Sequence, residues 1–185
     1  MVSWSVDKGK YNAFLEPQTK NIKPSVTYES LTALLETVVD PEIPVLTIAE
    51  MGMLRGVHWQ EATGEWEVLI TPTYSGCPAT DMIRAQIRMT LLENGISNVR
   101  ITQVLSPAWT TDWMTDAAKE KLRQYGIAPP VGKSMDAALL ENTVVLCPRC
   151  GSSNTHLVSA FSSTACKAFY TCNECLEPFD HFKCH

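Results

Sequence analysis

Apolar residues along the first two thirds of the chain recur at helix and strand spacings, and these spacings predict a series of helices and strands. In residues 27–38, apolar positions at three- and four-residue steps mark one face of a helix. Two strand-like segments, 53–59 and 66–70, are joined by a short polar connection, which predicts a hairpin. A second helix is expected over residues 78–94, because Pro78 suits a first helical position. Its predicted buried face consists of Met82, Ile83, Ile87, Leu91 and Leu92.

A third strand and a third helix complete the predicted domain. Residues 99–105 have strand character. Thr111 or Asp112 suits the N-terminal cap of a further helix. That helix is expected to run to about Tyr125, because Gly126 follows it. The resulting order, αββαβα, predicts a mixed fold of the α/β (α+β) class.

Two folded units are expected, because the 185 residues are enough for one ordinary domain and a smaller module. Residues 1–25 offer few core candidates and are interpreted as an N-terminal arm, and residues 26–128 as the larger domain. Residues 129–142 combine Pro, Gly and Ser around a short Ala-Leu run, which is typical of a linker. Residues 143–185 form the smaller module, which buries too little apolar surface to fold without a metal or a similar constraint.

Composition and charge disfavour several classes of protein. Hydrophobic residues make up 45% of the chain and charged residues 19%, as in globular proteins. The formal net charge of -5 argues against a surface for nucleic acid or for anionic membranes, which needs concentrated Lys and Arg. No apolar stretch is long enough for a signal peptide or a membrane-spanning helix, so we expect a cytoplasmic protein. In a reducing compartment, the seven cysteines suit metal binding or reactivity better than disulfides.

Two pairs of cysteines with CxxC spacing lie near the end of the chain. The first pair is Cys147 and Cys150, and the second is Cys172 and Cys175, with about twenty residues between them. Two intervening residues let the chain turn tightly enough for both sulfurs to reach one ion at about 2.3 Å, and the second pair completes a tetrahedron. The spacing is typical of a zinc ribbon and predicts structural zinc. Four sulfur ligands leave no open position for catalysis.

Other interpretations of the C-terminal cysteines stay open. The missing secretory signal disfavours a disulfide, and the lack of a strand-to-helix pattern around either CxxC disfavours a redox site. Iron bound as in rubredoxin is compatible with a cage of four sulfurs. A second metal site is a further hypothesis, although the spacing of its potential ligands matches no template and a buried cysteine often packs as a small hydrophobic residue. These ligands are Cys166, Cys184, His156, His181 and His185.

Cys77 is the one cysteine of the predicted larger domain, and it lies at the start of the second predicted helix. Free backbone N–H groups and the positive end of the helix dipole favour a thiolate at that place. Asp81 follows about one helical turn later and would form an incomplete metal site with Cys77. A buried thiol at a packed turn is the simpler interpretation, and Asp40, Glu42 and Glu50 are equally interpretable as solvated turn residues.

Two motifs in the predicted larger domain resemble the SufT-like domain of iron–sulfur cluster assembly factors. The first motif is DPEIP at residues 40–44, followed by IAEMGM at 48–53. The second is TPTYSGCP at 71–78, together with Asp81. The resemblance covers about residues 27–106, and the small α/β fold of that family agrees with the predicted αββαβα order.

The resemblance implies a role for the acidic residues and the thiol. Cys77, with Asp81 and also Asp40 and Glu42 near it, would contact iron or an iron–sulfur cluster in transit to a client protein. One departure from the family pattern is Glu50, where many relatives carry aspartate. That departure affects only the implied role of this position.

The whole chain is similar to the family of D subunits of bacterial phenylacetyl-CoA epoxidase systems. The similarity extends through WTTDW at residues 109–113, STACK at 163–167 and LEPFDHFKCH at 176–185. It implies an accessory maturation factor in phenylacetate catabolism, which assists iron–sulfur cluster or iron assembly in an oxygenase or reductase subunit. The implied partners are the protein components of that system, above all the iron–sulfur reductase.

The sequence lacks the motifs of the redox components themselves. It has no diiron Glu-x-x-His pair, no Gly-rich nucleotide motif and no ferredoxin cysteine spacing, so we expect no enzymatic activity of its own. Because one thiolate cannot hold a whole cluster, a carrier role would require a homodimer, a client thiol or a small thiol.

Two alternatives to a maturation role stay open. The first is a structural or regulatory subunit that tethers oxygenase components through its zinc module, with Cys77 packed in the core. The second is an enzyme that attacks a CoA thioester through Cys77, for which His58 is the one histidine of the predicted larger domain.

Overall fold

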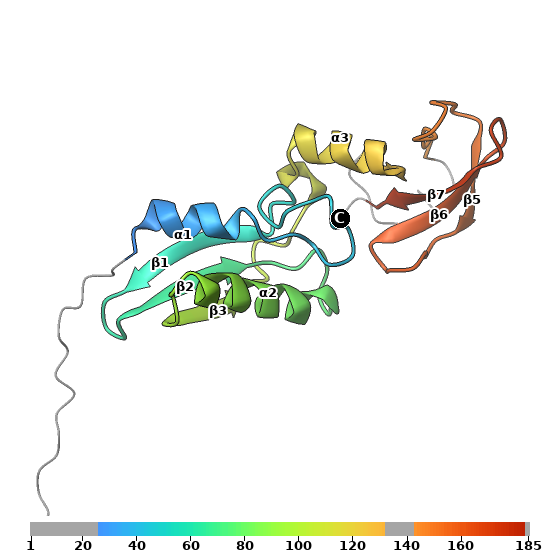
Figure 1. The fold of residues 1–185 in the computed structure, drawn as a ribbon. Helices are drawn as coiled ribbons and strands as arrows, with labels where there is room; N and C mark the ends of the chain where they lie inside the picture. The colour runs from blue at the N-terminus through green and yellow to red at the C-terminus, as the bar shows by residue number, and fades with distance from the viewer. Residues whose placement is uncertain (1–25, 132–142, 184–185) are drawn as a thin grey trace, which may run out of the picture.

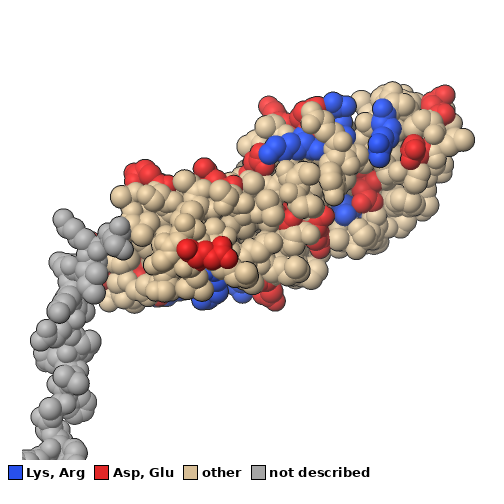
Figure 2. All heavy atoms as spheres, viewed as in Figure 1, with Lys and Arg blue, Asp and Glu red and all other residues tan. Residues whose placement is uncertain are grey.

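Two β-sheets, each with its own cluster of buried apolar side chains, organise the chain (Figure 1). The computed structural model describes residues 26–131 and 143–183. The predicted N-terminal arm, most of the predicted linker, Cys184 and His185 therefore lie outside the described residues. No helix within the described ranges is long and apolar enough to cross a membrane. On the face shown in Figure 2, basic side chains are interspersed with acidic ones.

The first unit contains three strands and three α-helices. Its elements are α1 (Tyr28–Leu35), β1 (Leu54–Gln60), β2 (Glu65–Ile70), α2 (Ala79–Glu93), β3 (Val99–Gln103), the 3-10 turn η1 (Thr111–Trp113) and α3 (Asp116–Tyr125). β1 and β2 form an antiparallel hairpin, and β3 runs parallel to β2. Side chains alternate along β2, so that Trp66, Val68 and Ile70 are buried among residues of α1 and α2. The predicted αββαβα order and the mixed fold class are confirmed.

Helix α2 buries a narrower face than the sequence pattern predicted. Ile83, Ile87 and Leu91 are buried, whereas Met82 is 58% and Leu92 56% exposed. Met82 and Leu92 are each one position away from the buried stripe, and a helix turns by about 100° per residue, so their side chains point away from the sheet. The prediction that these two residues are buried was wrong.

Two helix boundaries also differ from the prediction. Helix α3 begins after Thr115, whose hydroxyl accepts a backbone N–H of the first turn, whereas Thr111 starts the separate turn η1. Gly126 ends α3 with a φ of 95°, a backbone region that favours glycine. Helix α1 ends at Leu35, short of the predicted end at residue 38.

The second sheet contains four strands in the order β4-β7-β6-β5. They are β4 (Ile127–Ala128), β5 (Thr155–Ser159), β6 (Lys167–Cys172) and β7 (Pro178–Phe182). β5, β6 and β7 are antiparallel neighbours, and β4 runs parallel to β7. The predicted boundary at residue 128 assigned β4 to the larger domain, whereas its pairing joins it to the second sheet. The chain therefore passes from α3 directly into the second unit.

One tryptophan joins the two units. Trp109 is 4% exposed, and its indole N–H donates to the carbonyl of Met51 at 2.8 Å. Its ring also meets the ring of Phe182 edge-on, with centroids 6.2 Å apart. Phe182 and Cys166 from the second unit belong to the same buried cluster as the side chains of the first. The two units thus share part of one apolar core.

β7 carries a buried histidine next to β4. His181 is 1% exposed, its Nδ1–H donates to the carbonyl of Ala128 at 3.3 Å, and its ring meets Tyr170 edge-on. Burial lowers the pKa of His181 to about 4, because the charged imidazolium would lose its hydration. His181 is therefore neutral at pH 7.

We expect His181 to make the fold less stable in mild acid. Between pH 6.5 and 4, the unfolded chain binds a proton at this histidine while the folded chain does not. Lowering the pH from 7 to 5.5 should therefore lower the free energy of unfolding by about 1 kcal/mol. His181→Gln should therefore lose less unfolding free energy than wild type over this interval in urea titrations. His156→Gln, the same change at an exposed position of the second sheet, is the matched control. Identical pH dependence in His181→Gln and wild type would contradict this expectation.

Candidate functional site

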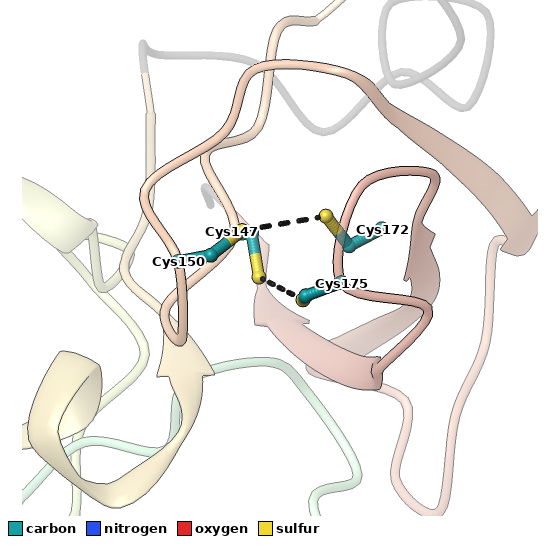
Figure 3. Close-up of side chains that lie close together, drawn as sticks. All are labelled: Cys147, Cys150, Cys172 and Cys175. Atoms are coloured by element: carbon teal, nitrogen blue, oxygen red, sulfur yellow. Dashed lines mark hydrogen bonds between the residues drawn. The ribbon is translucent and has the colours of Figure 1, made fainter.

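Four cysteines converge at one end of the second sheet (Figure 3). Cys147 and Cys150 lie in the turn before β5, Cys172 ends β6, and Cys175 follows in the turn toward β7. Gly151 has a φ of 76°, which favours glycine, and its N–H donates to the carbonyl of Cys147 at 2.9 Å. This tight turn holds the first two thiols close together.

The four sulfur atoms have the spacing that a tetrahedral metal site requires. The Sγ atoms of Cys147 and Cys175 are 3.6 Å apart, as are those of Cys150 and Cys172. All four sulfurs lie within 4.8 Å of one another. A tetrahedron with metal–sulfur bonds of about 2.3 Å has edges of about 3.8 Å, so one ion fits between them.

The backbone favours the thiolate form at one of these ligands. The N–H groups of Cys175 and Glu174 donate to the sulfur of Cys172 and lower the pKa of its thiol to about 7. The sulfur separations are well beyond the 2.05 Å or so of a disulfide bond, so the cysteines are free thiols. The four residues therefore form a metal-binding cluster whose coordination is closed by sulfur.

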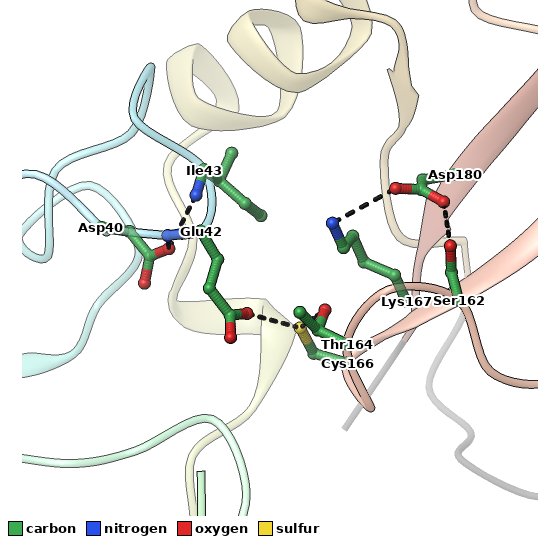
Figure 4. Close-up of polar contacts among 8 residues, drawn as sticks. All are labelled: Asp40, Glu42, Ile43, Ser162, Thr164, Cys166, Lys167 and Asp180. Carbon is green, nitrogen blue, oxygen red and sulfur yellow. Dashed lines mark hydrogen bonds and ion pairs between the residues drawn. The ribbon is translucent and has the colours of Figure 1, made fainter. Parts of the chain in front are cut away.

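A second group of polar side chains lies where the two units meet, and we call it the junction cluster. It combines the loop after α1, the loop between β2 and α2, and the turn before β6, and Figure 4 shows its carboxylates beside the second unit. Its members are Asp40, Glu42, Tyr74, Cys77, Thr164, Cys166 and Lys167. The structure thus brings three of the residues predicted to contact iron, Asp40, Glu42 and Cys77, to the boundary with the second unit.

Cys77 precedes α2 in the loop that follows β2. It is 9% exposed, and the Tyr74 hydroxyl donates a hydrogen bond to its sulfur. Burial, together with the neighbouring Cys77, raises the pKa of Tyr74 to about 12, so the hydroxyl keeps its proton. Gly76, with a φ of 87°, allows the turn between the two residues. Tyr74 therefore provides a hydrogen-bond donor to the Cys77 sulfur.

Asp40 and Glu42 have different tasks in the same loop. Asp40 is 5% exposed, and its Oδ1 accepts the N–H groups of Glu42 at 2.8 Å and Ile43 at 2.9 Å. Figure 4 shows the Glu42 side chain extending from this turn toward Cys166. Burial raises the pKa of both carboxyl groups, and the charge of Asp40 raises that of Glu42 further. Asp40 holds the loop, and Glu42 is the carboxylate that reaches the second unit.

Cys166 approaches Glu42 from the second unit. Its thiol donates to Oε2 of Glu42 at 3.8 Å and lies 3.1 Å from the Thr164 hydroxyl. Cys166 is 4% exposed, and burial raises the pKa of its thiol to about 11, to which the charges of Glu42 and Cys77 contribute. No sequence spacing connects residues 77 and 166. Sequence reasoning therefore assigned Cys166 only to packing or to a different metal site.

Lys167 brings a positive charge to the junction cluster. It is 6% exposed, and its Nζ lies 3.2 Å from Oδ2 of Asp180, whose other oxygen accepts the Ser162 hydroxyl. The ammonium also lowers the pKa of Asp40 and Glu42, although burial has the larger effect on both. Lys167 therefore partly neutralises the acidic groups around it.

Two other acidic residues singled out from the sequence lie outside the junction cluster. The side chain of Asp81 is 91% exposed and lies 3.8 Å from Arg84, so it faces solvent. Oε1 of Glu50 accepts the Lys121 ammonium at 2.6 Å, and Oε2 accepts the Thr47 N–H at 3.1 Å. Glu50 thus connects its loop to α3.

The histidines of the second unit do not join Cys166. Nδ1 of His156 lies 2.9 Å from the side-chain oxygen of Asn173, and His181 packs between β4 and Tyr170. Among residues 26–131 and 143–183, one group of three or more ligating side chains has metal-binding spacing. It consists of Cys147, Cys150, Cys172 and Cys175, which we call the ribbon cysteines. The structure therefore gives no support to a second metal site of Cys166 with these histidines.

Comparisons with known proteins match two segments of the chain to families. Residues 132–183 match the PaaD zinc beta ribbon domain, and residues 29–105 match the iron-sulfur cluster assembly protein family. Over 163 residues, the chain is 53% identical to an Escherichia coli (strain K12) protein provisionally named as the D subunit of 1,2-phenylacetyl-CoA epoxidase; the match covers 88% of this chain and 96% of that protein.

Two further similarities concern the first unit. The chain is 35% identical over 97 residues to the Fe-S protein maturation auxiliary factor of Porphyromonas gingivalis, which covers 52% of this chain and 90% of that protein. A crystal structure of the domain of unknown function DUF59 from Bacillus anthracis has a TM-score of 0.47 and 28% identity, covering 51% of this chain and 90% of that one. Cys77 thus lies in the segment that matches the iron-sulfur cluster assembly protein family, and Cys166 lies in the segment that matches the zinc beta ribbon domain.

Loss of a single ribbon cysteine should release the metal and loosen the second sheet. Cys172→Ser removes one of four thiolates, and a structural zinc site contributes about 10–16 kcal/mol of apparent binding energy to folding. We expect elemental analysis of the purified variant to show almost no bound metal, and limited proteolysis to cleave within residues 143–183. Cys77→Ser, the same change outside the ribbon, should keep the metal that the four C-terminal cysteines bind. A full metal complement in Cys172→Ser would disprove the assignment.

Proposed function

The chain belongs to the family of phenylacetyl-CoA epoxidase D subunits, and on this premise we propose that it is an accessory maturation factor of the epoxidase system. Its proposed task is to assist iron–sulfur cluster or iron assembly in an oxygenase or reductase subunit. The match of residues 29–105 to iron–sulfur cluster assembly proteins and the similarity to a maturation auxiliary factor support an accessory role in iron–sulfur assembly. Iron or a cluster is then the cargo of this protein.

The observation that carries the proposal is the buried thiol of Cys77 within an acidic cluster. Thiolates are the usual protein ligands of iron–sulfur clusters, and carboxylates bind iron as well. Cys77 has the Tyr74 hydroxyl as a hydrogen-bond donor and Glu42 in the same cluster. It also directly precedes Pro78, the N-cap residue of the 15-residue helix α2. These features suit reversible binding of a metal better than they suit packing alone.

We assign zinc to the four ribbon cysteines and give it a structural role. The match to a zinc beta ribbon family and the closed set of four sulfurs support this assignment. When bound, the ion supplies a cross-link between the turn before β5 and the turn between β6 and β7. In this proposal the ribbon holds β6 and β7 against the larger unit, and no iron chemistry takes place there.

The proposed client is the iron–sulfur reductase of the epoxidase system. One thiolate cannot hold a cluster, so further ligands have to come from the client, a small thiol, a second copy or another cysteine of this chain. Docking onto a client would bring its empty cluster ligands to the junction cluster.

Nucleophilic catalysis by Cys77 has less support. A thiol nucleophile needs a general base within hydrogen-bond reach. His58 lies opposite Glu67 on the edge strand β1, and the Tyr74 hydroxyl donates to the Cys77 sulfur. An attack on a CoA thioester through Cys77 is therefore not proposed.

Replacement of Cys77 should abolish assistance to the client without disturbing the fold. When the reductase is produced together with Cys77→Ala, its iron and acid-labile sulfide per chain should fall to the level obtained without this protein. The ribbon zinc and the circular dichroism spectrum should stay at wild-type values, because alanine replaces a small buried thiol.

Ser75→Ala, an exposed change in the same loop, is the matched control and should support full cluster occupancy. Full occupancy of the reductase with Cys77→Ala would refute the maturation role at Cys77. If that result came with unchanged, stoichiometric copurification of oxygenase components, the tethering role would be favoured instead.

A further inference from the structure

The junction cluster contains two cysteines that come from different units of the chain. Cys77 is 9% and Cys166 4% exposed, and both are free thiols outside the ribbon. Both thiols belong to the same buried cluster of side chains, and, besides burial, the charge of Cys77 raises the pKa of both Cys166 and Tyr74. A lone buried thiol is readily explained as a small hydrophobic residue. Packing as small hydrophobic residues does not readily explain two thiols that meet at the boundary between units, beside a carboxylate.

Glu42 supplies an oxygen ligand between the two units. Its carboxylate accepts the Cys166 thiol at 3.8 Å, and the same thiol lies 3.1 Å from the Thr164 hydroxyl. The nearby ammonium of Lys167 lies 3.2 Å from Asp180, so it balances charge without occupying the space between Glu42 and Cys166 (Figure 4). Two sulfurs and one carboxylate oxygen form a donor set that suits iron.

From this arrangement we infer that Cys77, Cys166 and Glu42 form one composite site for the transferred iron or iron–sulfur cluster. The inference rests on the proposed function and names the second protein thiolate that Cys77 needs. Each unit contributes one sulfur, so the site exists only while the ribbon is docked on the larger unit. Three protein ligands leave a coordination position for sulfide or for a thiol of the client. Through that position the cargo can pass to the client without becoming fully free.

Binding at this site exchanges protons for metal and requires no electron transfer. Each thiol releases its proton to water as its sulfur forms a bond to Fe²⁺. Two thiolates and one carboxylate then surround a doubly charged cation, which leaves a single negative charge. The ammonium of Lys167 lies close enough to Glu42 to offset that charge.

The three ligands have to draw together when the metal enters. Their ligand atoms are not all within 4.8 Å of one another, in contrast to the four ribbon sulfurs. Glu42 is half-buried on a loop, and Cys166 lies in the turn just before β6, so both can shift by small amounts. A site that closes only around its cargo binds more weakly than a preformed one, as transfer to a client requires.

The ribbon metal helps to determine where Cys166 lies. Cys166 directly precedes β6, and the ribbon ligand Cys172 ends the same strand. The carbonyl of Cys166 also accepts the N–H of Lys183 at 2.9 Å, next to the end of β7. Because the extended strand β6 connects the two cysteines, a shift of Cys172 after loss of the ribbon metal should displace Cys166. The composite site therefore gives the ribbon a function beyond its own stability.

Anaerobic titration of the zinc-loaded, full-length protein with Fe²⁺ tests the composite site. We expect wild type to bind Fe²⁺ in addition to the ribbon zinc. Cys166→Ser and Cys77→Ser should each weaken Fe²⁺ binding about tenfold or more, with zinc content unchanged. Co²⁺ gives a second readout, because it does not displace the more tightly bound Zn²⁺ and its thiolate charge-transfer absorption should weaken in each single variant.

Ser163→Ala, an exposed change in the same turn, should bind Fe²⁺ like wild type. Because a serine hydroxyl at a buried position can destabilise the turn, Cys166→Ala repeats the measurement with an apolar replacement. Wild-type Fe²⁺ affinity in both Cys166 variants, with loss in Cys77→Ser, would overturn the composite site and leave the proposed function standing. Wild-type affinity in the Cys77 variant as well, or no Fe²⁺ binding by wild type, would also overturn it. The maturation role itself fails separately, through full reductase occupancy with Cys77→Ala.

Discussion

The cluster of four cysteine sulfurs is the constraint on which the second unit depends. The buried cluster of that unit is small and is centred on Tyr170, Phe179 and the ribbon cysteines themselves, so apolar burial alone gives it little stability. A metal held by the four sulfurs joins the turn before β5 to the ends of β6 and β7. From this sheet, Phe182 and Cys166 reach the core of the larger unit. We therefore expect the position of the junction cluster to depend on the metal site at the other end of β6.

The boundary between the units combines apolar contact with buried polar groups. Trp109 packs on Phe182 and donates to Met51, which suits a permanent intramolecular contact. Beside it, Asp40 and Lys167 are almost fully buried, together with two thiols. Burial of charged groups costs free energy even when they are paired, and an interface selected for stability alone would favour apolar residues. Their presence fits a boundary whose side chains have a task besides adhesion.

Most of the local structure could be predicted from short-range patterns. Two-residue spacings in strands and three- and four-residue spacings in helices were enough to predict the αββαβα order, because each element needs one apolar face against the core. The errors arose where local signals compete. Met82 and Leu92 are apolar but adjoin the buried stripe of α2, and Thr111 is a good cap residue that serves a separate 3-10 turn. Which signal prevails depends on the packing around the helix, which no window of sequence contains.

The sequence by itself determined the four ribbon cysteines, because metal-ligand spacing is a local feature of the chain. It singled out Cys77 only as a hypothesis, through the resemblance of its motif to that of iron–sulfur assembly factors. Only the tertiary structure decided which residues accompany Cys77. In the folded chain, Asp81 lies in solvent beside Arg84, whereas Cys166 belongs to the junction cluster although it is distant from Cys77 along the chain. The physical reason is that docking of the second sheet, through Phe182 and its neighbours, sets these distances, and such long-range contacts leave no periodic trace in the sequence.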